Sequence, residues 1–256
     1  MARTFTYSAL VLRVRAAGES NREAWFLTAE EGILRATLFG GPKSRLRSHV
    51  APFHRGTLWV YHDPVRDARK VTDFDVLSWR PGIRETYYRS MAALSLSETI
   101  LASHGGGGNW AEALSLADKA LDALEGADEG TGSRIGIHFL WNWAELLGIR
   151  PSLGRCSSCA CEAGPDEVLW YSPGDGGLRC ASCGGISPKQ NQGAPRGEFL
   201  AVGPGGRRWL KTVESLSPAL LSRYIPEGES FRQVRALVLG IITAALGRRL
   251  DSWDHI

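Results

Sequence analysis

The feature that most constrains the fold is a change in the spacing of apolar residues at Pro81 and Gly82. Before this point apolar and polar residues alternate, which is typical of half-buried β-strands. After it, apolar residues recur every three or four positions, which is typical of packed α-helices. The sequence therefore predicts a β-rich amino-terminal part followed by an α-helical part.

The amino-terminal part contains five alternating stretches: ALVLRVR, EAWFLTA, GILRATLF, GTLWVYH and RKVTDFDVLSW. In the first stretch, strict alternation places Leu10, Leu12 and Val14 on one face, and it places Arg13 and Arg15 on the other with Val11. Five short strands separated by turns fit a small barrel or sandwich.

The remainder of the chain predicts helices on both sides of a cysteine-rich region. The expected helices cover residues 84–103, 109–126, 133–149, 197–202, 207–216, 218–225 and 229–253. Asn109 suits an N-cap, and the four glycines before it suit a loop because glycine has low helix propensity. His138 lies among large apolar residues, and we expect it to be a core histidine with satisfied hydrogen bonds.

All five cysteines lie between positions 156 and 183. Cys156 and Cys159 form one Cys-x2-Cys pair, and Cys180 and Cys183 form a second pair 20 residues later. Two such turns supply four thiolates to one tetrahedral metal ion, so the spacing predicts one structural Zn²⁺ with no open position for catalysis. Cys161 is expected to be a free thiol. The alternative that Cys161 replaces Cys159 as a metal ligand stays open. The alternative for the whole group is a set of reduced or redox-active thiols.

The charge of the chain is unevenly distributed, although its net value is only +3. Residues 1–80 carry 13 basic and 8 acidic side chains, and residues 186–256 carry 10 and 6. Basic ends around a more acidic middle favour a surface that meets an anionic partner. The longest apolar run, Ala236–Leu246, has 11 residues and is too short to span a bilayer. We expect a cytoplasmic protein without a signal peptide.

The stretch FGGPKSRLRSH places Lys43, Arg45 and Arg47 in a loop after the third strand. It does not form a nucleotide-binding P-loop, because Thr37 stands where the first glycine is required and Pro42 has no N–H for a phosphate. A barrel with such a loop can bind single strands through basic residues and aromatic rings. The candidate contacts are Lys43, Arg45, Arg47, Arg13, Arg15, Arg69, Lys70, Trp59 and Tyr61. The sequence leaves open whether the loop is only solvated and whether the two rings are buried.

The sequence offers no motif of a hydrolase, and we expect a protein that is not an enzyme. A nuclease or nucleotidyltransferase would need a carboxylate cluster for Mg²⁺. The dense acidic set near the basic region comprises Asp63, Asp67, Asp73 and Asp75. These positions are better interpreted as turn and strand-surface residues.

Several stretches together resemble the bacterial RecO family of recombination mediators over essentially the full length. They are GGPKSR, YYRSMAALSLSETI, FLWNWAELLGIRPSLGRCSSC and GRRLDSW. The resemblance implies a multidomain α+β fold, with an OB-like barrel before an all-α domain that carries an inserted four-cysteine zinc module. The expected divisions are residues 1–80, 81–155, 156–188 and 189–256, the second and fourth forming the helical domain.

The resemblance also implies a function in DNA repair. The barrel and the helical domain of members bind single- and double-stranded DNA. Members also anneal complementary strands and help RecR load RecA onto strands coated by single-strand-binding protein. In this chain the family's zinc positions fall on the four paired cysteines, and the basic loop falls on Lys43, Ser44 and Arg45. The role of Arg47 is inferred from its charge and spacing. An RNA-binding or translation-associated OB/zinc-ribbon protein remains the alternative.

Overall fold

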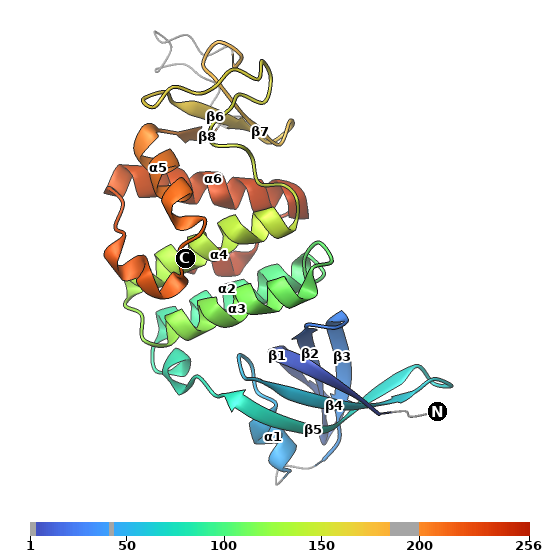
Figure 1. Cartoon of the computed structure of the whole chain (residues 1–256). Helices are drawn as coiled ribbons and strands as arrows, with labels where there is room; N and C mark the ends of the chain where they lie inside the picture. Colours follow the sequence, from blue (N-terminus) through green and yellow to red (C-terminus); the bar gives the residue numbers. More distant parts are fainter. Residues whose placement is uncertain (1–3, 41–43, 185–199) are drawn as a thin grey trace.

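The computed structural model describes residues 4–40, 44–184 and 200–256. These residues form an elongated molecule with a β-barrel at one end, a layer of helices in the middle and a small cysteine-containing sheet at the other end (Figure 1). The carboxyl terminus returns to the helical part. None of the helices in the described ranges is long and apolar enough to cross a membrane.

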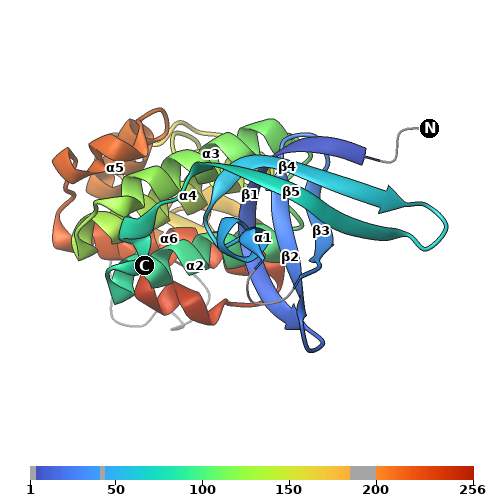
Figure 2. The ribbon, with the colours of Figure 1, turned by 90° about the horizontal axis from the view of Figure 1, so that it is seen from below.

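The barrel confirms the five strands expected from the alternating pattern. Its strands are β1 (Thr4–Ala17), β2 (Asn21–Thr28), β3 (Gly32–Leu38), β4 (Arg55–Asp63) and β5 (Ala68–Ser78). They close in the order β1-β2-β3-β5-β4, with antiparallel neighbours except for β3 and β5. Those two strands run parallel and share a single residue pair, Thr37 with Lys70. The β4–β5 hairpin extends beyond the barrel (Figure 2).

Strand β1 has two buried faces in its middle, from Ala9 to Leu12. Val11 packs inside the barrel, whereas Leu10 and Leu12 pack outward against the helices. A β-bulge between Val11 and Arg13 then shifts the register against β2. Because of this bulge Val14 packs with the barrel interior and Arg13 points outward, so strict alternation through residue 14 was wrong.

The segment between β3 and β4 differs in part from the predicted loop. Residues 45–49 form a short helix, α1 (Arg45–His49), that packs near β5. Both Arg45 and Arg47 therefore lie on a helical turn. Lys43 falls outside the described residues.

The helical part follows the predicted order with small shifts of the boundaries. Its elements are η1 (Pro81–Arg84), α2 (Tyr87–Ala102), α3 (Trp110–Glu125), α4 (Glu129–Leu146), α5 (Pro204–Val213), η2 (Pro218–Arg223), α6 (Gly228–Leu246) and η3 (Asp251–His255). The Asn109 side chain accepts a hydrogen bond from the Glu112 N–H at 3.4 Å and caps α3, as predicted. His138 is buried on α4 with Nε2 3.0 Å from the Leu216 carbonyl, but its Nδ1 has no partner.

Two predicted helices were wrong in part. Residues 200–202 form β8 (Leu200–Val202), which pairs with β6 (Leu169–Ser172), and β6 pairs in turn with β7 (Gly177–Arg179). The last long helix ends at Leu246 because Gly247 adopts a left-handed conformation with φ of 67°. The start of the predicted helix over 197–202 lies outside the described residues.

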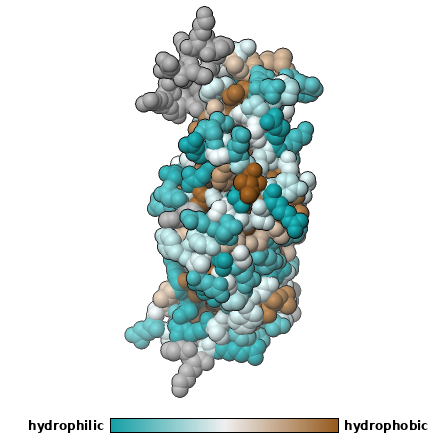
Figure 3. All heavy atoms as spheres, turned by 90° about the vertical axis from the view of Figure 1, so that its left-hand side faces the viewer, coloured by the Kyte–Doolittle hydropathy of each residue, from teal (hydrophilic) through white to brown (hydrophobic). Residues whose placement is uncertain are grey.

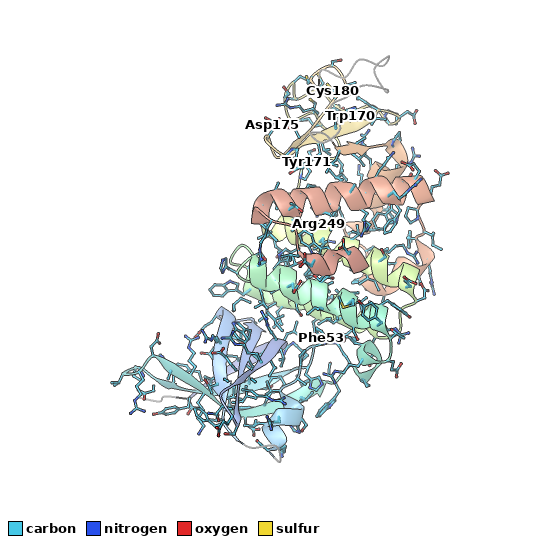
Figure 4. The ribbon with its side chains drawn as sticks, turned by 180° about the vertical axis from the view of Figure 1, so that it is seen from behind. Phe53, Trp170, Tyr171, Asp175, Cys180 and Arg249 are labelled. Atoms are coloured by element: carbon cyan, nitrogen blue, oxygen red, sulfur yellow. The ribbon has the colours of Figure 1, made fainter. Side chains whose placement is uncertain are left out.

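The barrel is joined to the helices through Arg80, whose side chain is only 1% exposed. Its Nε donates to Asp122 at 2.7 Å, its Nη1 donates to the Phe53 carbonyl at 2.8 Å, and Asp118 accepts a further bond. Phe53 lies at the junction in Figure 4 and packs into the core shared with the helices. This buried arginine is paired with carboxylates and hydrogen-bonded at each of its three nitrogens, so it fixes the end of the barrel against α3.

The surface seen in Figure 3 is mostly hydrophilic, with separate hydrophobic spots. The most exposed large apolar side chains of the helical part include Ile225, at 71%, and Tyr87, at 69%. Single exposed apolar residues are ordinary on a protein surface.

Candidate nucleic-acid interface and metal centre

The outer face of β1, β2 and β3 carries an arginine–tryptophan cluster that consists of Arg13, Arg15, Glu23, Trp25 and Arg35. The strand register places Arg13 and Arg35 directly opposite Trp25, one on each neighbouring strand. The guanidinium carbons of Arg15, Arg35 and Arg13 lie 4.8, 5.5 and 5.8 Å from the indole centroid. These distances are within the range of cation–π attraction, so the indole holds three cations together on one surface.

Glu23 is the only carboxylate of this cluster, and it is 9% exposed. Its carboxylate lies 2.7 Å from the Arg15 guanidinium and also pairs with Arg35. Burial opposes ionisation of Glu23, but the hydrogen bonds from Arg35 and Arg15 outweigh it and lower the pKa of Glu23. The cluster thus keeps one buried negative charge beneath three exposed positive charges, and its net charge at neutral pH is positive.

A groove opens beside the cluster, where β3 and β5 share only one residue pair. It has a volume of about 510 Å³ and is lined by Arg35, Thr37 and Arg69, among others. Arg69 is half-buried and pairs with Glu31 at 3.2 Å, so much of its charge is already neutralised. Arg35 belongs both to the groove and to the cluster, which makes the two surfaces continuous.

Lys70 and the two predicted aromatic residues lie on the neighbouring strands. The Lys70 ammonium is 5.2 Å from the Phe39 ring centroid. In the strand register of β4 and β5, Lys70 lies directly opposite Tyr61. Trp59 and Tyr61 are both half-buried on β4, whose alternate residues Leu58 and Val60 fill the barrel. The two rings are therefore outside the barrel core.

The structure brings together only part of the predicted contact set. Arg13 and Arg15 meet in the cluster, whereas Arg45 and Arg47 lie on α1 near β5. Sequence reasoning missed Trp25 and Arg35. They occupy outward positions of β2 and β3 in the alternating pattern, but only the register between strands shows that they are neighbours.

The four paired cysteines come together from two chain segments, and their sulfur atoms all lie within 4.8 Å of one another. Cys156 and Cys159 precede β6, whereas Cys180 and Cys183 follow β7. The sulfurs of Cys159 and Cys180 are 3.9 Å apart. Four sulfurs placed about 2.3 Å from a tetrahedral ion are separated by about 3.8 Å, so the arrangement can hold one metal ion.

The thiols differ in their ease of ionisation. Burial disfavours the thiolate of Cys156, but backbone N–H groups of Cys159 and Cys180 outweigh this effect and lower its pKa to about 6. Hydrogen bonds with Cys159 and Cys180 raise the pKa of Cys183 to about 12. Four adjacent thiolates repel one another, and a divalent cation removes that repulsion. Cys161 is exposed and lies outside the group.

The acidic residues considered for an enzyme do not gather. Asp63 accepts a backbone hydrogen bond from Val65 at 3.0 Å, and Asp73 accepts one from Phe74 at 2.8 Å. In the described parts of the chain, the four cysteines are the one group of three or more His, Cys, Asp or Glu side chains able to hold a metal ion. The acidic set therefore offers no such site there.

Comparisons with known proteins agree along most of the chain. The family model described as Recombination protein O N terminal matches residues 1–78, and the one described as Recombination protein O C terminal matches residues 84–196. A protein of Rubrobacter xylanophilus named DNA repair protein RecO is 29% identical over 190 residues, which covers 73% of this chain and 75% of that protein.

Two further proteins of the same name cover more of the chain. The one from Nocardioides sp. is 27% identical over 236 residues, or 86% of this chain and 94% of its own length. The one from Anaeromyxobacter sp. is 28% identical over 247 residues, or 94% of this chain and 91% of its own length. The similarity thus extends across the barrel, the helices and the cysteine region.

Proposed function

This chain belongs to the RecO family of DNA repair proteins, and we propose that it serves DNA repair by holding DNA strands on the outer face of β1, β2 and β3. The mechanism is electrostatic and involves no chemical step. Arginines neutralise backbone phosphates, and counterions released from the DNA drive binding.

The observation that carries this proposal is the arginine–tryptophan cluster. Three exposed guanidiniums surround one indole, with a groove beside them. Guanidinium groups recognise phosphates with two parallel hydrogen bonds, and aromatic rings stack on bases. OB-type barrels bind oligonucleotides on the face of their second and third strands, and in this barrel those strands carry Trp25 and Arg35.

Further contacts come from the residues around the same barrel. We assign phosphate contacts to Lys43, Arg45, Arg47, Arg69 and Lys70, and base contacts to Trp59 and Tyr61. Lys70 and Tyr61 are direct neighbours across β4 and β5, which supports a joint contact with one nucleotide.

The cellular role that fits this surface is that of a recombination mediator. The protein binds single- and double-stranded DNA, anneals complementary strands, and helps RecR load RecA onto DNA coated by single-strand-binding protein. Such a role places it in the cytoplasm with the nucleoid. We propose the division into a barrel (1–80), a helical domain (81–155 and 189–256) and a cysteine module (156–188).

The cysteine module holds one structural Zn²⁺ in this proposal. Cys156, Cys159, Cys180 and Cys183 supply the four ligands, and the sulfur separation of 3.9 Å supports a tetrahedral ion. Four protein ligands leave no position for an activated water. The ion therefore contributes to folding rather than to chemistry.

The test is the binding of a labelled single-stranded DNA oligomer, measured by fluorescence anisotropy at several salt concentrations. One variant combines Arg13→Gln, Arg15→Gln, Glu23→Gln and Arg35→Gln. Glu23 is included because a buried carboxylate without its partners destabilises the fold. We expect a loss of affinity of about 10- to 100-fold and a salt slope that is smaller by about 2, since three phosphate contacts contribute about 0.7 each.

A second variant, with Lys43, Arg45 and Arg47 changed to Ala, measures the loop and α1 separately. The matched control changes Arg223 and Arg232 to Gln, because both are exposed arginines of the helical part. Wild-type affinity in the cluster variant, with its unfolding midpoint preserved, would contradict the proposal. Competition with an RNA oligomer of the same sequence tests the RNA-binding alternative.

A further inference from the structure

We propose that Arg248 and Arg249, on the turn between α6 and η3, form a second phosphate-binding site for the single strand that the barrel binds. This inference rests on the proposed function, because it extends the surface assigned to DNA there. The site is the turn between α6 and η3, and its ligand is the backbone of single-stranded DNA.

The turn that carries the two arginines is anchored at both ends. Gly247, with φ of 67°, ends α6 and reverses the chain direction. Leu250 is buried, and the indole N–H of Trp253 donates to the Thr99 hydroxyl at 3.0 Å. Arg248 and Arg249 are exposed between these anchors. Figure 4 shows Arg249 below α6, in the helical part of the molecule. Because the turn is anchored, its backbone loses little freedom when the two arginines bind phosphate, and the remaining cost is that of ordering their side chains.

A groove connects this turn with the arginine–tryptophan cluster. It has a volume of about 260 Å³, and its lining includes Arg13 from β1, Leu101 from α2, and Arg248 and Arg249. Arg13 is also the member of the cluster that lies 5.8 Å from the Trp25 centroid. The cluster thus has a groove on each side: Arg35 belongs to the one between β3 and β5, and Arg13 belongs to this one. A single DNA strand that binds across the cluster can therefore pass along Arg13 to the turn.

The ion pairs of the turn leave its arginines available. Among the described residues Arg248 has no ion-pair partner within 4.0 Å, and Arg249 pairs with Asp254. The side chains of that pair are 56% and 60% exposed. Exposed pairs of this kind contribute little to stability, so a phosphate can replace Asp254 as the partner of Arg249.

Two carboxylates of the groove oppose an anionic ligand. Glu98 and Asp251 line it together with the arginines. Their presence makes the site weaker than the cluster. It also means that two kinds of substitution in this groove should change DNA affinity in opposite directions. Loss of an arginine weakens binding, whereas loss of Glu98 strengthens it, and both changes act only on DNA long enough to reach the turn.

The experiment measures anisotropy for a series of labelled oligothymidylates of increasing length at fixed low salt. The variant combines Arg248→Gln and Arg249→Gln. We expect wild-type affinity for the shortest oligomers that bind and a loss of about 5- to 20-fold for the longest, with a salt slope that is smaller by about 1.4 for two phosphates. In contrast, Glu98→Gln should raise affinity for the longest oligomers about 2- to 3-fold, because one repulsive charge is removed.

The control is the Arg223→Gln, Arg232→Gln variant, which loses the same charge elsewhere on the helical part and should bind all lengths like the wild type. Wild-type binding of every length by the Arg248, Arg249 variant would overturn the inference. An equal loss at all lengths would overturn it too, because the arginines would then act only through net charge. Failure of the unmodified protein to bind any oligomer would instead contradict the proposed function.

Discussion

The cysteine centre (Cys156, Cys159, Cys180 and Cys183) and the arginine–tryptophan cluster are assembled in different ways. The centre is built from two short pairs, each of which supplies its ligands from one tight turn, so its chemistry can be recognised along the chain. The cluster is built from one or two residues on each of three strands, and only the register of β1, β2 and β3 makes them neighbours. A local motif identifies a site by itself, whereas a surface site depends on the completed sheet.

The two sites also differ in what they contribute to stability. The four thiols lie in a small module that contributes two short strands, β6 and β7, to a three-stranded sheet and has little core of its own, so a bound ion would supply folding free energy there. The cluster lies over a barrel whose interior is already filled by residues such as Phe26 and Phe74. Its arginines are exposed, and exposed charges add little to stability as long as the buried Glu23 is not left without its partners. We therefore expect changes in one region to affect folding and changes in the other to affect binding.

Removal of the proposed metal ion is expected to have the largest effect on this comparison between the two sites. Chelation, or the change Cys156→Ser, should lower the midpoint of thermal unfolding by on the order of 10 °C, because the module loses the ion that joins its two segments. DNA affinity per folded molecule should change less than about 2-fold, since the arginines that neutralise phosphates lie on the barrel. Calorimetry and anisotropy on the same preparation measure the two effects.

The matched control for this experiment is Cys161→Ser. Cys161 is exposed and stands outside the four ligands, so its loss should leave both the unfolding midpoint and the metal content unchanged. If Cys156→Ser weakens DNA binding as strongly as it lowers stability, in protein shown to be folded, the two regions are not separate in function.

Trp25 offers a sharper test of the cluster itself. Its change to Ala removes the surface that orders three guanidiniums, and we expect DNA affinity to fall about 5- to 10-fold. Phe keeps a smaller aromatic face and should lose only about 2-fold. The same change at Trp59, which lies half-buried on β4, provides the comparison. A larger loss at Trp59 than at Trp25 would transfer the principal base contact to β4.

Much of the fold could be predicted because its signals are local. The alternation of apolar and polar residues before Pro81 predicted five strands. The spacing of apolar residues every three or four positions after it predicted the three helices α2, α3 and α4. The β-bulge between Val11 and Arg13 could not be seen in this way, since it depends on pairing with β2. That one extra residue directs Arg13 away from the barrel interior and toward Trp25.

The two errors in the carboxy-terminal region have different causes. Leu200–Val202 is a short apolar run, and such runs do not distinguish strand from helix until a partner strand is known. The end of α6 did have a local signal, because a glycine directly after the last apolar residue of the helical period is typical of a helix that stops in a left-handed conformation. Extension of the helix through Gly247 concealed the turn that presents Arg248 and Arg249.

The smallest expected effect is a dependence of folding stability on pH that arises at the junction between the barrel and the helical part. His54 lies at the barrel–helix junction, with Nδ1 2.8 Å from the His49 carbonyl and Nε2 3.4 Å from the Arg84 guanidinium. Burial lowers the pKa of His54, and the nearby charges of Arg84 and Arg80 lower it further. Because the unfolded chain then takes up the proton first, stability is complete above the unfolded pKa near 6.5 and is lost as the pH falls through it toward the folded pKa.

We therefore expect urea unfolding to show a stability that falls between about pH 7 and 5.5, by at most about 1.4 kcal/mol per pH unit for this one proton. His54→Gln should flatten part of that dependence. The measurement needs the Cys156→Ser background, because acid also protonates thiolates and would release the proposed metal ion. His138, whose pKa is lowered by burial on α4, contributes a second proton that remains in the variant. An unchanged pH dependence in His54→Gln would show that the junction stays intact when His54 is protonated, and would place the acid sensitivity in the helical part instead.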